Sequence, residues 1–388
     1  MRHVSDHERR ARLGTRHGLA PGCEAGSVDA ATRSIVALHA TEAPTVYLSC
    51  WARVPEVAVA DVDRAIYEDR SVVRQLAMRR TLWGFPRDLL PAIWPSASAR
   101  VAAVEAARLA KDIVAGGVAP DGTAWVDAAG AGVLAELARH PGGLPAADIR
   151  QAVPMIDERF ETKWGTVNFS SRVLTVLGAR AEIVRGDNVG GWHVSRPRWT
   201  LTEHWLAEAG SLGSTEGYRR LVGAWLRSFG PGTEDDLVWW LGATKGIVRD
   251  ALAALGAEPA SLDDGSTGWL LPDDLDEVAA PDPGVALLPV LDPTVMGWKQ
   301  RDFHLGPHRD AIFDRNGNAG TTAWVDGRVV GCWVQDDTGR VRVNLLEPIP
   351  ARARKALDAE AERLTAWLDG LQVPIIYKSP AMKAALAS

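Results

Sequence analysis

A run at residues 233–252 places the strongest constraint on the fold, because two short apolar patterns flank Gly242 there. Thr233 and Thr244 are each placed to cap a helix, and Gly242 suits the tight turn between the two helices. Apolar residues on both sides of the turn face inward, which is typical of a helix-turn-helix. Lys245 and Arg249 share an exposed face of the second helix, where we expect them to contact a nucleic-acid ligand.

Two earlier parts of the chain show a related order of elements. In the first, we expect helices at residues 5–16 and from Ser27 onward, then a short helix at residues 71–80 that feeds a strand at residues 81–85. In the second, helices at residues 102–114, 131–140 and 145–153 precede a helix at residues 168–177 that Gly178 ends, and strands follow at residues 181–185 and 198–201. A helix followed at once by a hairpin is the arrangement of a winged helix, so the pattern predicts weakly repeated winged-helix units.

The last part of the chain has strand character. Residues 258–284 are acidic and contain Pro and Gly, which indicates a linker or a third wing. Strands are expected at residues 285–290, 321–325, 328–334 and 341–346, with a tight turn at Asp326-Gly327, and residues 351–369 form an amphipathic helix that ends at Gly370. We therefore predict four domains, residues 1–98, 99–202, 203–283 and 284–388, and a small sheet or barrel in the last.

The net charge of -6 hides an uneven distribution. Residues 251–290 contain eight acids and no Lys or Arg, so the rest of the chain carries +2. Of the 43 basic residues 36 are Arg, whose planar group suits phosphate, although a GC-rich genome also favours Arg codons. Arg79, Arg80, Arg172 and Arg301 are candidate phosphate contacts, and the alternative for each is a solvated surface charge.

The role of the many aromatic residues is also open between two alternatives. The 16 Trp outnumber Phe and Tyr together, and Trp serves either as core filling or as a platform for base stacking. Trp239 and Trp240 are adjacent on one expected helix, so at least one of them is partly exposed.

The sequence predicts neither a metal site nor a cofactor site. Residues 314–320 resemble a calcium loop superficially, but Ala319 and Val325 occupy the positions of the required Gly and Glu. The loop is then either a tight hairpin on Asn316-Gly317 or a probe that carries Arg315 and Asn316 into a nucleic-acid groove. Three scattered cysteines, a charged N-terminal stretch and the lack of a long apolar run lead us to expect a cytoplasmic protein.

The triplet His39-Ala40-Thr41 is the strongest candidate for chemistry. Pro44 disfavours helix at Ala43, so we expect the triplet at a helix C-terminus and turn. The structural alternative is a histidine that interacts with the helix dipole. If the turn is extended, His39 and Thr41 lie on one side, where they can orient a water and His39 can accept its proton.

Three motifs together resemble a known family. They are residues 38–53 (LHATEAPTVYLSCWAR), Leu288-Pro289 with Asp292-Pro293 and residues 296–299 (MGWK), and residues 313–320 (FDRNGNAG). They resemble the bacterial winged-helix DNA-binding family that contains the AlkZ and YcaQ DNA glycosylases. The likeness implies an α+β, C-shaped molecule of three tandem winged helices and a C-terminal β-rich, barrel-like domain.

The resemblance also implies catalytic residues and a reaction. The family's catalytic motif, Gln, an apolar residue, then Gln or Asp, falls on His39, Ala40 and Thr41, so we expect His39 and Thr41 to be catalytic. Thr41 offers neither the charge of Asp nor the amide of Gln. Glu42 is the neighbouring carboxylate, but local geometry should direct it elsewhere.

The implied function is that of a monofunctional DNA glycosylase without a cofactor. Its expected partner is double-stranded DNA with N7-alkylated purines or bulky genotoxin adducts, including interstrand crosslinks, in repair or antibiotic self-resistance. We expect a monomer without membrane contacts. The alternatives are a winged-helix DNA-binding protein without catalysis, either a regulator or a lesion sensor, and a set of protein-interaction modules.

Overall fold

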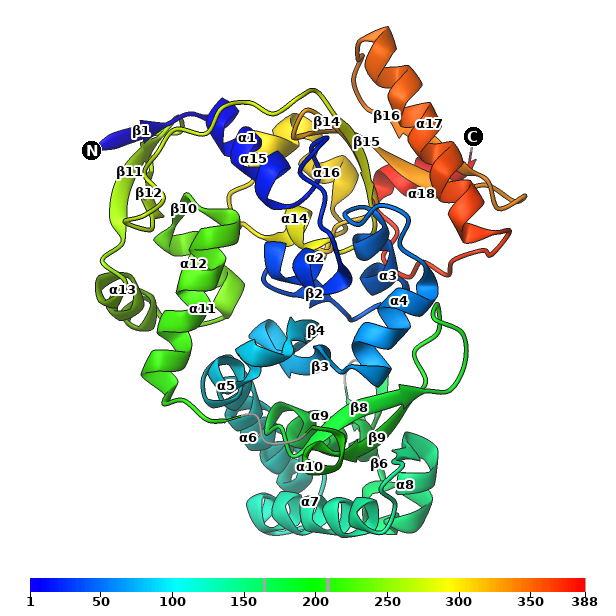
Figure 1. Ribbon diagram of the computed structural model, residues 1–388. Helices are drawn as coiled ribbons and strands as arrows, with labels where there is room; N and C mark the ends of the chain where they lie inside the picture. Colours follow the sequence, from blue (N-terminus) through cyan, green and yellow to red (C-terminus); the bar gives the residue numbers. More distant parts are fainter. Residues whose placement is uncertain (163–164, 207–209, 388) are drawn as a thin grey trace.

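The computed structural model describes residues 1–162, 165–206 and 210–387 (Figure 1). Helices and strands alternate through the whole of this part of the chain, so the α+β character is confirmed.

Three of the sheets share one strand order. The first is β2-β4-β3, the second β5-β9-β8 and the third β10-β12-β11. In each, a two-residue strand pairs antiparallel with the second arm of a hairpin. The strands are β2 (Leu38–His39), β3 (Val72–Ala77), β4 (Thr81–Pro86), β5 (Leu144–Pro145), β8 (Ile183–Asn188), β9 (Pro197–Leu201), β10 (Gly232–Thr233), β11 (Glu258–Leu262) and β12 (Thr267–Leu270). The architecture therefore repeats along the chain.

The third sheet also contains the start of the chain. Strand β1 (Arg2–Val4) runs parallel to β11, with Val4 opposite Leu262. The N-terminal residues are thus built into a unit that lies more than 200 residues later in the sequence.

Helices of the first unit begin at the predicted caps. The Ser5 hydroxyl accepts a hydrogen bond from the Glu8 amide, and the Ser27 hydroxyl accepts one from the Ala30 amide. The helices are α1 (Asp6–Arg16), α2 (Val28–Ser34), α3 (Ala43–Trp51) and α4 (Val59–Asp63), which η1 (Arg64–Glu68) continues.

The predicted helix at residues 71–80 is wrong. These residues form β3, which pairs with β4 from Val72 opposite Pro86 to Ala77 opposite Thr81, and the turn η2 (Met78–Arg80). Gln, Leu, Ala, Met and Arg are good helix formers, but the paired β-branched residues of the hairpin override that weak preference. The strand expected at residues 81–85 is confirmed as β4.

The second unit contains the longest helices of the first half of the chain. Its elements are α6 (Ala99–Ala115), α7 (Gly122–Ala138), α8 (Ala146–Ala152), η5 (Pro154–Ile156), β6 (Arg159–Thr162), β7 (Gly165–Asn168), α9 (Phe169–Ala179) and α10 (Thr202–Trp205). The elements η3 (Arg87–Leu89), α5 (Leu90–Ile93) and η4 (Trp94–Ser98) lead into it. The expectation that Gly178 ends α9 is wrong, because Gly178 lies inside the helix. Ala181, with φ 59°, follows the helix end.

The third unit confirms the helix-turn-helix pattern. Helix α11 (Ser214–Phe229) precedes α12 (Glu234–Leu241) and α13 (Lys245–Ala254). Thr233 and Asp236 form a reciprocal capping box, and the Thr244 hydroxyl caps α13. Gly242 has φ 62°, a conformation that favours glycine. The acidic stretch that follows contains the hairpin β11-β12 rather than a linker alone.

The C-terminal unit is β-rich, and its described strands form an open sheet, which was one of the two predicted alternatives, rather than a barrel. Strands β13 (Val285–Leu288), β14 (Thr322–Val325), β15 (Arg328–Gln335) and β16 (Val341–Leu345) pair in chain order, without a β13-β16 contact that would close them. Asp326 and Gly327 form the predicted turn with positive φ. The helices are α14 (Pro293–Met296), α15 (Asp302–Leu305), η6 (Gly306–His308), α16 (Arg309–Ile312), α17 (Ala351–Leu368) and α18 (Pro380–Ala387).

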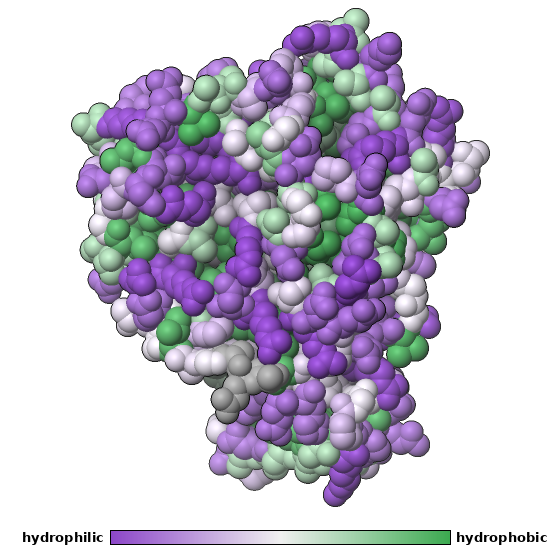
Figure 2. Space-filling view, viewed as in Figure 1, coloured by the Kyte–Doolittle hydropathy of each residue, from purple (hydrophilic) through white to green (hydrophobic). Residues whose placement is uncertain are grey.

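Two main clusters of buried apolar side chains hold the molecule together. One joins the first, third and C-terminal units and also includes Val184 of β8 and Trp205 of α10, and the other lies within the second unit alone. Gln75 on β3 links them, because its side-chain amide donates to the Gly178 carbonyl at 2.7 Å. No helix in the described part of the chain is long and apolar enough to cross a membrane, and the face in Figure 2 is largely hydrophilic.

Candidate active site and DNA interface

The His39 triplet lies between a strand and a helix. His39 pairs with Trp83 across β2 and β4, and the Ala40 amide donates to the Leu82 carbonyl at 2.9 Å. The expectation of a helix C-terminus is wrong, since α3 begins at Ala43 just after the triplet. A proline is tolerated in the first turn of a helix because its missing amide needs no partner there. The backbone is extended at His39, where β2 ends, and Thr41 lies in the bend between this strand and α3.

His39 is buried and neutral. Its side chain is 2% exposed and its ring meets Trp83 edge-on, with 4.7 Å between ring centroids. Burial, reinforced by the charge of Arg79, lowers the pKa of His39 to about 3. The imidazole therefore acts as a hydrogen-bond acceptor or base at neutral pH, without a charge of its own.

Three side chains of the triplet region have a buried polar atom without a protein partner among the described residues. These atoms are Nδ1 of His39, Oγ1 of Thr41 and Oε2 of Glu42. Buried polar atoms are nearly always hydrogen-bonded in folded proteins, so such a concentration is expected where a substrate or a reacting water binds. The triplet is the part of the molecule best suited to chemistry.

Glu42 points toward the C-terminal segment, in line with the sequence expectation. Its Oε1 accepts hydrogen bonds from the amides of Ile376 and Tyr377, at 3.0 and 3.1 Å. Burial raises the pKa of Glu42, and the two amides oppose that rise. The carboxylate thus ties the triplet to a segment more than 300 residues away in the sequence.

Arg79 and Arg301 stack on the indole of Trp239. Their guanidinium carbons lie 4.0 and 5.1 Å from the ring centroid, and Arg301 also lies 4.4 Å above the ring centre of Phe313. Neither forms an ion pair with an acid of the described residues. Burial lowers the pKa of Arg79 to about 10 and of Arg301 to about 9, so both remain cationic at neutral pH. Two cations without an acid partner form a site for an anion.

The turn that carries Arg79 is strained. Arg79 and Arg80 have φ values of 55° and 62°, which non-glycine residues adopt at a cost. Such strain is most often found where function requires it. Arg80 is largely exposed and lies 3.3 Å from Glu105.

A groove of about 370 Å³ runs beside this turn. It is lined by Arg79, Arg80, Arg100 and Arg108 together with Val104 and Glu105. Arg100 and Arg108 are candidate phosphate contacts that the sequence did not single out, because only the docking of α6 beside the hairpin shows that they face it. This groove and the Trp239 stack form one cationic surface next to His39.

A buried ion pair between Arg53 and Asp292 holds the helix that follows the triplet. Arg53, two residues after the end of α3, donates to both carboxylate oxygens of Asp292, at 2.9 and 2.7 Å, and both side chains are fully buried. The Ser49 hydroxyl donates to the same carboxylate at 2.7 Å, and Asp292 caps α14 through the Thr294 amide. This network fixes α3, which begins two residues after the triplet, against the C-terminal unit.

The other predicted contacts are spread over the molecule. Lys245 and Arg249 are exposed on α13 as expected, but they pair with Glu234 and Asp235 of α12. Arg172 on α9 is mostly buried and pairs with Asp112 at 2.6 Å. Their roles stay predictions.

The loop at residues 314–320 forms the tight hairpin that was one of the two alternatives. Asp314 accepts hydrogen bonds from the amides of Asn316 and Asn318, and a bridge pairs Phe313 with Ala319. Arg315 and Asn316 are exposed at its tip. No group of three or more potential metal-ligating side chains gathers within the described ranges.

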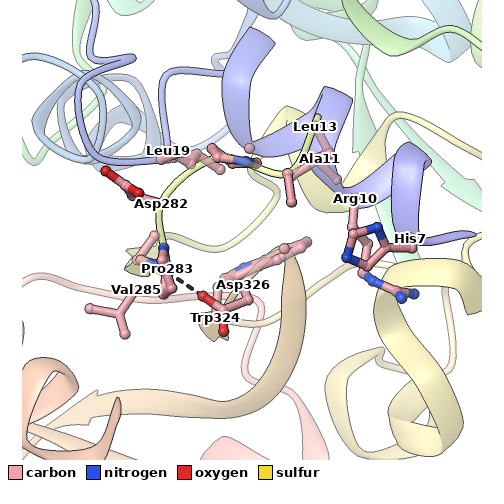
Figure 3. Close-up of a pocket in the computed structure, with 17 residues that line it drawn as sticks. His7, Arg10, Ala11, Leu13, Leu19, Asp282, Pro283, Val285, Trp324 and Asp326 are labelled. Carbon is pink, nitrogen blue, oxygen red and sulfur yellow. Dashed lines mark hydrogen bonds between the residues drawn. The ribbon is translucent and has the colours of Figure 1, made fainter. Parts of the chain in front are cut away.

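A cavity of about 230 Å³ lies apart from the triplet (Figure 3). His7 and Arg10 of α1 line one end, and Asp282 and Leu19 line the other. The Asp326 carboxylate near Trp324 accepts the Gly284 amide at 2.9 Å. None of the triplet or Trp239-stack residues lines this cavity, so it is not part of the candidate active site.

Sequence reasoning left the role of Trp239 open and missed Phe313. Trp240 is buried at 1% exposure and Trp239 is partly exposed, which confirms the prediction for this pair. Nothing local in the sequence indicates that Arg79 and Arg301 meet on Trp239, because the three residues come from three units.

Comparison with known proteins identifies the class. The family described as DNA glycosylase AlkZ-like matches residues 32–367, so the chain belongs to the AlkZ-like DNA glycosylase family, as its motifs indicated. The protein is a DNA glycosylase and its substrate is DNA. Among solved structures, it is similar to the Streptomyces sahachiroi DNA glycosylase AlkZ, with a TM-score of 0.75 and 21% identity over 94% of this chain and 97% of that chain. No curated protein matches the chain.

Proposed function

We propose that this glycosylase hydrolyses the N-glycosidic bond of N7-alkylated purines or bulkier genotoxin-adducted bases in duplex DNA, including interstrand crosslinks, in repair or self-resistance. The observation that carries the proposal is the buried, neutral His39. Its Nδ1 has no hydrogen-bond partner among the described residues, and it lies beside cationic Arg79. The resemblance of the family motifs supports the substrate class.

The site suits a reaction in which the base leaves before water adds fully. An N7-alkylated purine carries a positive charge, so it departs with the bonding electron pair as a neutral base and leaves an oxocarbenium-like sugar. A water oriented by His39 and Thr41 then adds to C1′ and gives up a proton to His39. The product is an abasic site. The side chains of the triplet offer no amine for a covalent sugar adduct, which fits a monofunctional enzyme.

DNA binding itself adjusts the basicity of His39. Part of the reason for its low pKa is the nearby charge of Arg79. A DNA phosphate bound to Arg79 and Arg301 cancels that repulsion and raises the pKa of His39 toward a more useful value. The free enzyme thus holds a weak base, and the complex holds a stronger one.

The repeated sheets act as three tandem winged helices around a DNA channel in a C-shaped monomer. The shared strand order β2-β4-β3, β5-β9-β8 and β10-β12-β11 supports this assignment. Arg79 and Arg80 lie at the tip of the first hairpin, and with Arg301, Arg315 and Asn316 they grip the backbone around the lesion. Three free cysteines fit a reducing cytoplasm.

Release of the damaged base tests the substrate class directly. Purified enzyme is incubated with duplexes that carry one N7-methylguanine, one uracil or one 8-oxoguanine, and the released base is identified by mass spectrometry. We expect release from the N7-methylguanine duplex alone, and no DNA adduct after borohydride reduction. Faster release of uracil or 8-oxoguanine than of N7-methylguanine would exclude the proposed substrate class.

A further inference from the structure

A short segment between α17 and α18 is fastened beside the triplet. We call residues 373–379 the strap. Three contacts fix it: the Val373 amide donates to Gln335 Oε1 at 2.9 Å, Glu42 Oε1 accepts the amides of Ile376 and Tyr377, and Ser379 packs on Gly320. A Cβ on Gly320 would lie only 2.5 Å from the Ser379 hydroxyl. The strap therefore has a defined position between the triplet and the loop at residues 314–320.

The strap holds an apolar side chain out in solvent. Ile376 is 78% exposed, although its amide is fixed by Glu42. Its neighbour Ile375 packs against the core instead. The fixed backbone thus presents a large aliphatic side chain to solvent at a defined position next to the triplet.

A cation and a tyrosine lie next to Ile376 on the strap. Lys378 is exposed two residues further on, and its amide donates to the Ile376 carbonyl at 3.1 Å. Burial raises the pKa of Tyr377, and the nearby charges of Glu42 and Asp314 add to that rise. Asp314 belongs to the loop at residues 314–320, whose exposed tip is Arg315-Asn316. An apolar side chain with a cation close by suits a base step next to a backbone phosphate.

We propose that Ile376 is a wedge that enters the DNA base stack next to the lesion, and that Glu42 is the positioning residue that holds the wedge. This inference rests on the proposed function, since it places the lesion at the neighbouring triplet. Apolar side chains inserted between base steps unstack them and kink the duplex. Opening the stack in this way gives His39 and Thr41 access to C1′ of the damaged nucleotide.

Fluorescence measures the wedge without any excision. The probe is a duplex with one tetrahydrofuran site and 2-aminopurine next to it, whose fluorescence rises when the base unstacks. Wild-type enzyme should raise the signal, and Ile376→Ala should bind but leave it near the level of free DNA. The matched control is Leu275→Ala, which truncates another exposed apolar side chain within an acidic stretch. A full signal with Ile376→Ala, or none with wild type, overturns the wedge.

Excision kinetics give a second, independent readout. Single-turnover release of N7-methylguanine by Ile376→Ala should slow about tenfold in duplex DNA, because the wedge no longer offsets unstacking, and stay near the wild-type rate in single strands. Equal slowing in both substrates would contradict a wedge. If wild-type enzyme releases no base at all, the proposed function fails, while the fluorescence result still decides the role of Ile376.

Glu42 variants test the positioning role. Glu42→Ala removes the acceptor of both strap amides and should reproduce the duplex-only loss. Glu42→Gln keeps an oxygen acceptor in the same place and should restore the 2-aminopurine signal and most of the duplex rate. Equal loss in Glu42→Gln and Glu42→Ala would show that the charge matters rather than the anchoring, which overturns the positioning role.

Discussion

Arg79 lies over the indole ring of Trp239, with 4.0 Å between its guanidinium carbon and the ring centroid. The two residues come from the turn after β3 and from α12, so the first hairpin reaches across to the third unit. Trp239 holds Arg79 in place beside His39 without neutralising its charge, which leaves the charge available to DNA.

Removal of Arg79 should weaken DNA binding in a salt-dependent way. For Arg79→Ala we expect lower affinity for all DNA sequences and a salt slope reduced by about one, because one phosphate contact is lost. Fluorescence anisotropy at several salt concentrations measures both quantities. The control is Arg354→Ala on α17, which removes an exposed arginine paired with Asp358. An unchanged slope for Arg79→Ala would argue against a phosphate contact.

Relief of the strained turn should stabilise the protein and impair its function. Arg80→Gly places a glycine at a φ of 62°, where we expect the free energy of unfolding to rise by about 0.5–1 kcal/mol. The same change should lower affinity for duplex DNA, since it removes a cation from the groove. Urea unfolding and DNA titration measure the two effects. Loss of stability in Arg80→Gly would show that Arg80 contributes more to the fold than its ion pair with Glu105 suggests.

The buried pair Arg53–Asp292 should be far more sensitive than a surface pair. Asp292→Asn leaves the Arg53 charge buried without a counterion, so we expect the protein to lose about 3–5 kcal/mol in urea unfolding. The exposed pair Arg354–Asp358 provides the control, since Asp358→Asn should cost no more than about 1 kcal/mol. Similar losses in the two variants would contradict the role given to the buried network.

Acid should destabilise the protein below about pH 6.5, the ordinary pKa of histidine. Burial lowers the pKa of His17 and His39 to about 3, so on acidification the unfolded chain takes up protons that the folded protein does not. The free energy of unfolding therefore has its full value above pH 6.5. Below that pH it falls by up to about 1.4 kcal/mol per pH unit for each such histidine, down to about pH 3.

The variant His17→Gln measures how much of the acid destabilisation comes from His17. His17 contacts the Thr294 hydroxyl and the Ser228 carbonyl, and Gln retains polar groups for both. Urea unfolding at pH 7.5 and pH 5.0 should give a smaller difference for this variant than for wild type, with exposed His140→Gln as the matched control. The same difference in wild type and His17→Gln would rule out this account of acid sensitivity.

Local features of the fold were predictable and long-range contacts were not. The caps at Thr233 and Thr244 and the turn at Asp326-Gly327 depend on a few consecutive residues, so the sequence reveals them. The residues of the hairpin arm β3 favour a helix locally, and only pairing with β4 makes them a strand, so local sequence predicts the wrong element there.

The candidate site likewise has a part that local sequence predicts and a part that depends on long-range contacts. His39 and Thr41 were found through the triplet, whose family resemblance is local. The stack of Arg79 and Arg301 on Trp239 joins three segments that are more than 60 residues apart, and Glu42 and Ile376 are more than 300 residues apart. No periodicity or spacing encodes such contacts.

The central claim is that His39 acts on the water that replaces a damaged base. The direct measurement is the single-turnover rate of abasic-site formation on a duplex with one N7-methylguanine, for wild type, His39→Ala and His39→Gln. We predict that His39→Ala loses at least about a hundredfold in rate with DNA affinity retained, the magnitude of a lost general base. His39→Gln keeps a hydrogen-bonding group and should fall between the two. A His39→Ala enzyme that matches the wild-type rate would contradict the account.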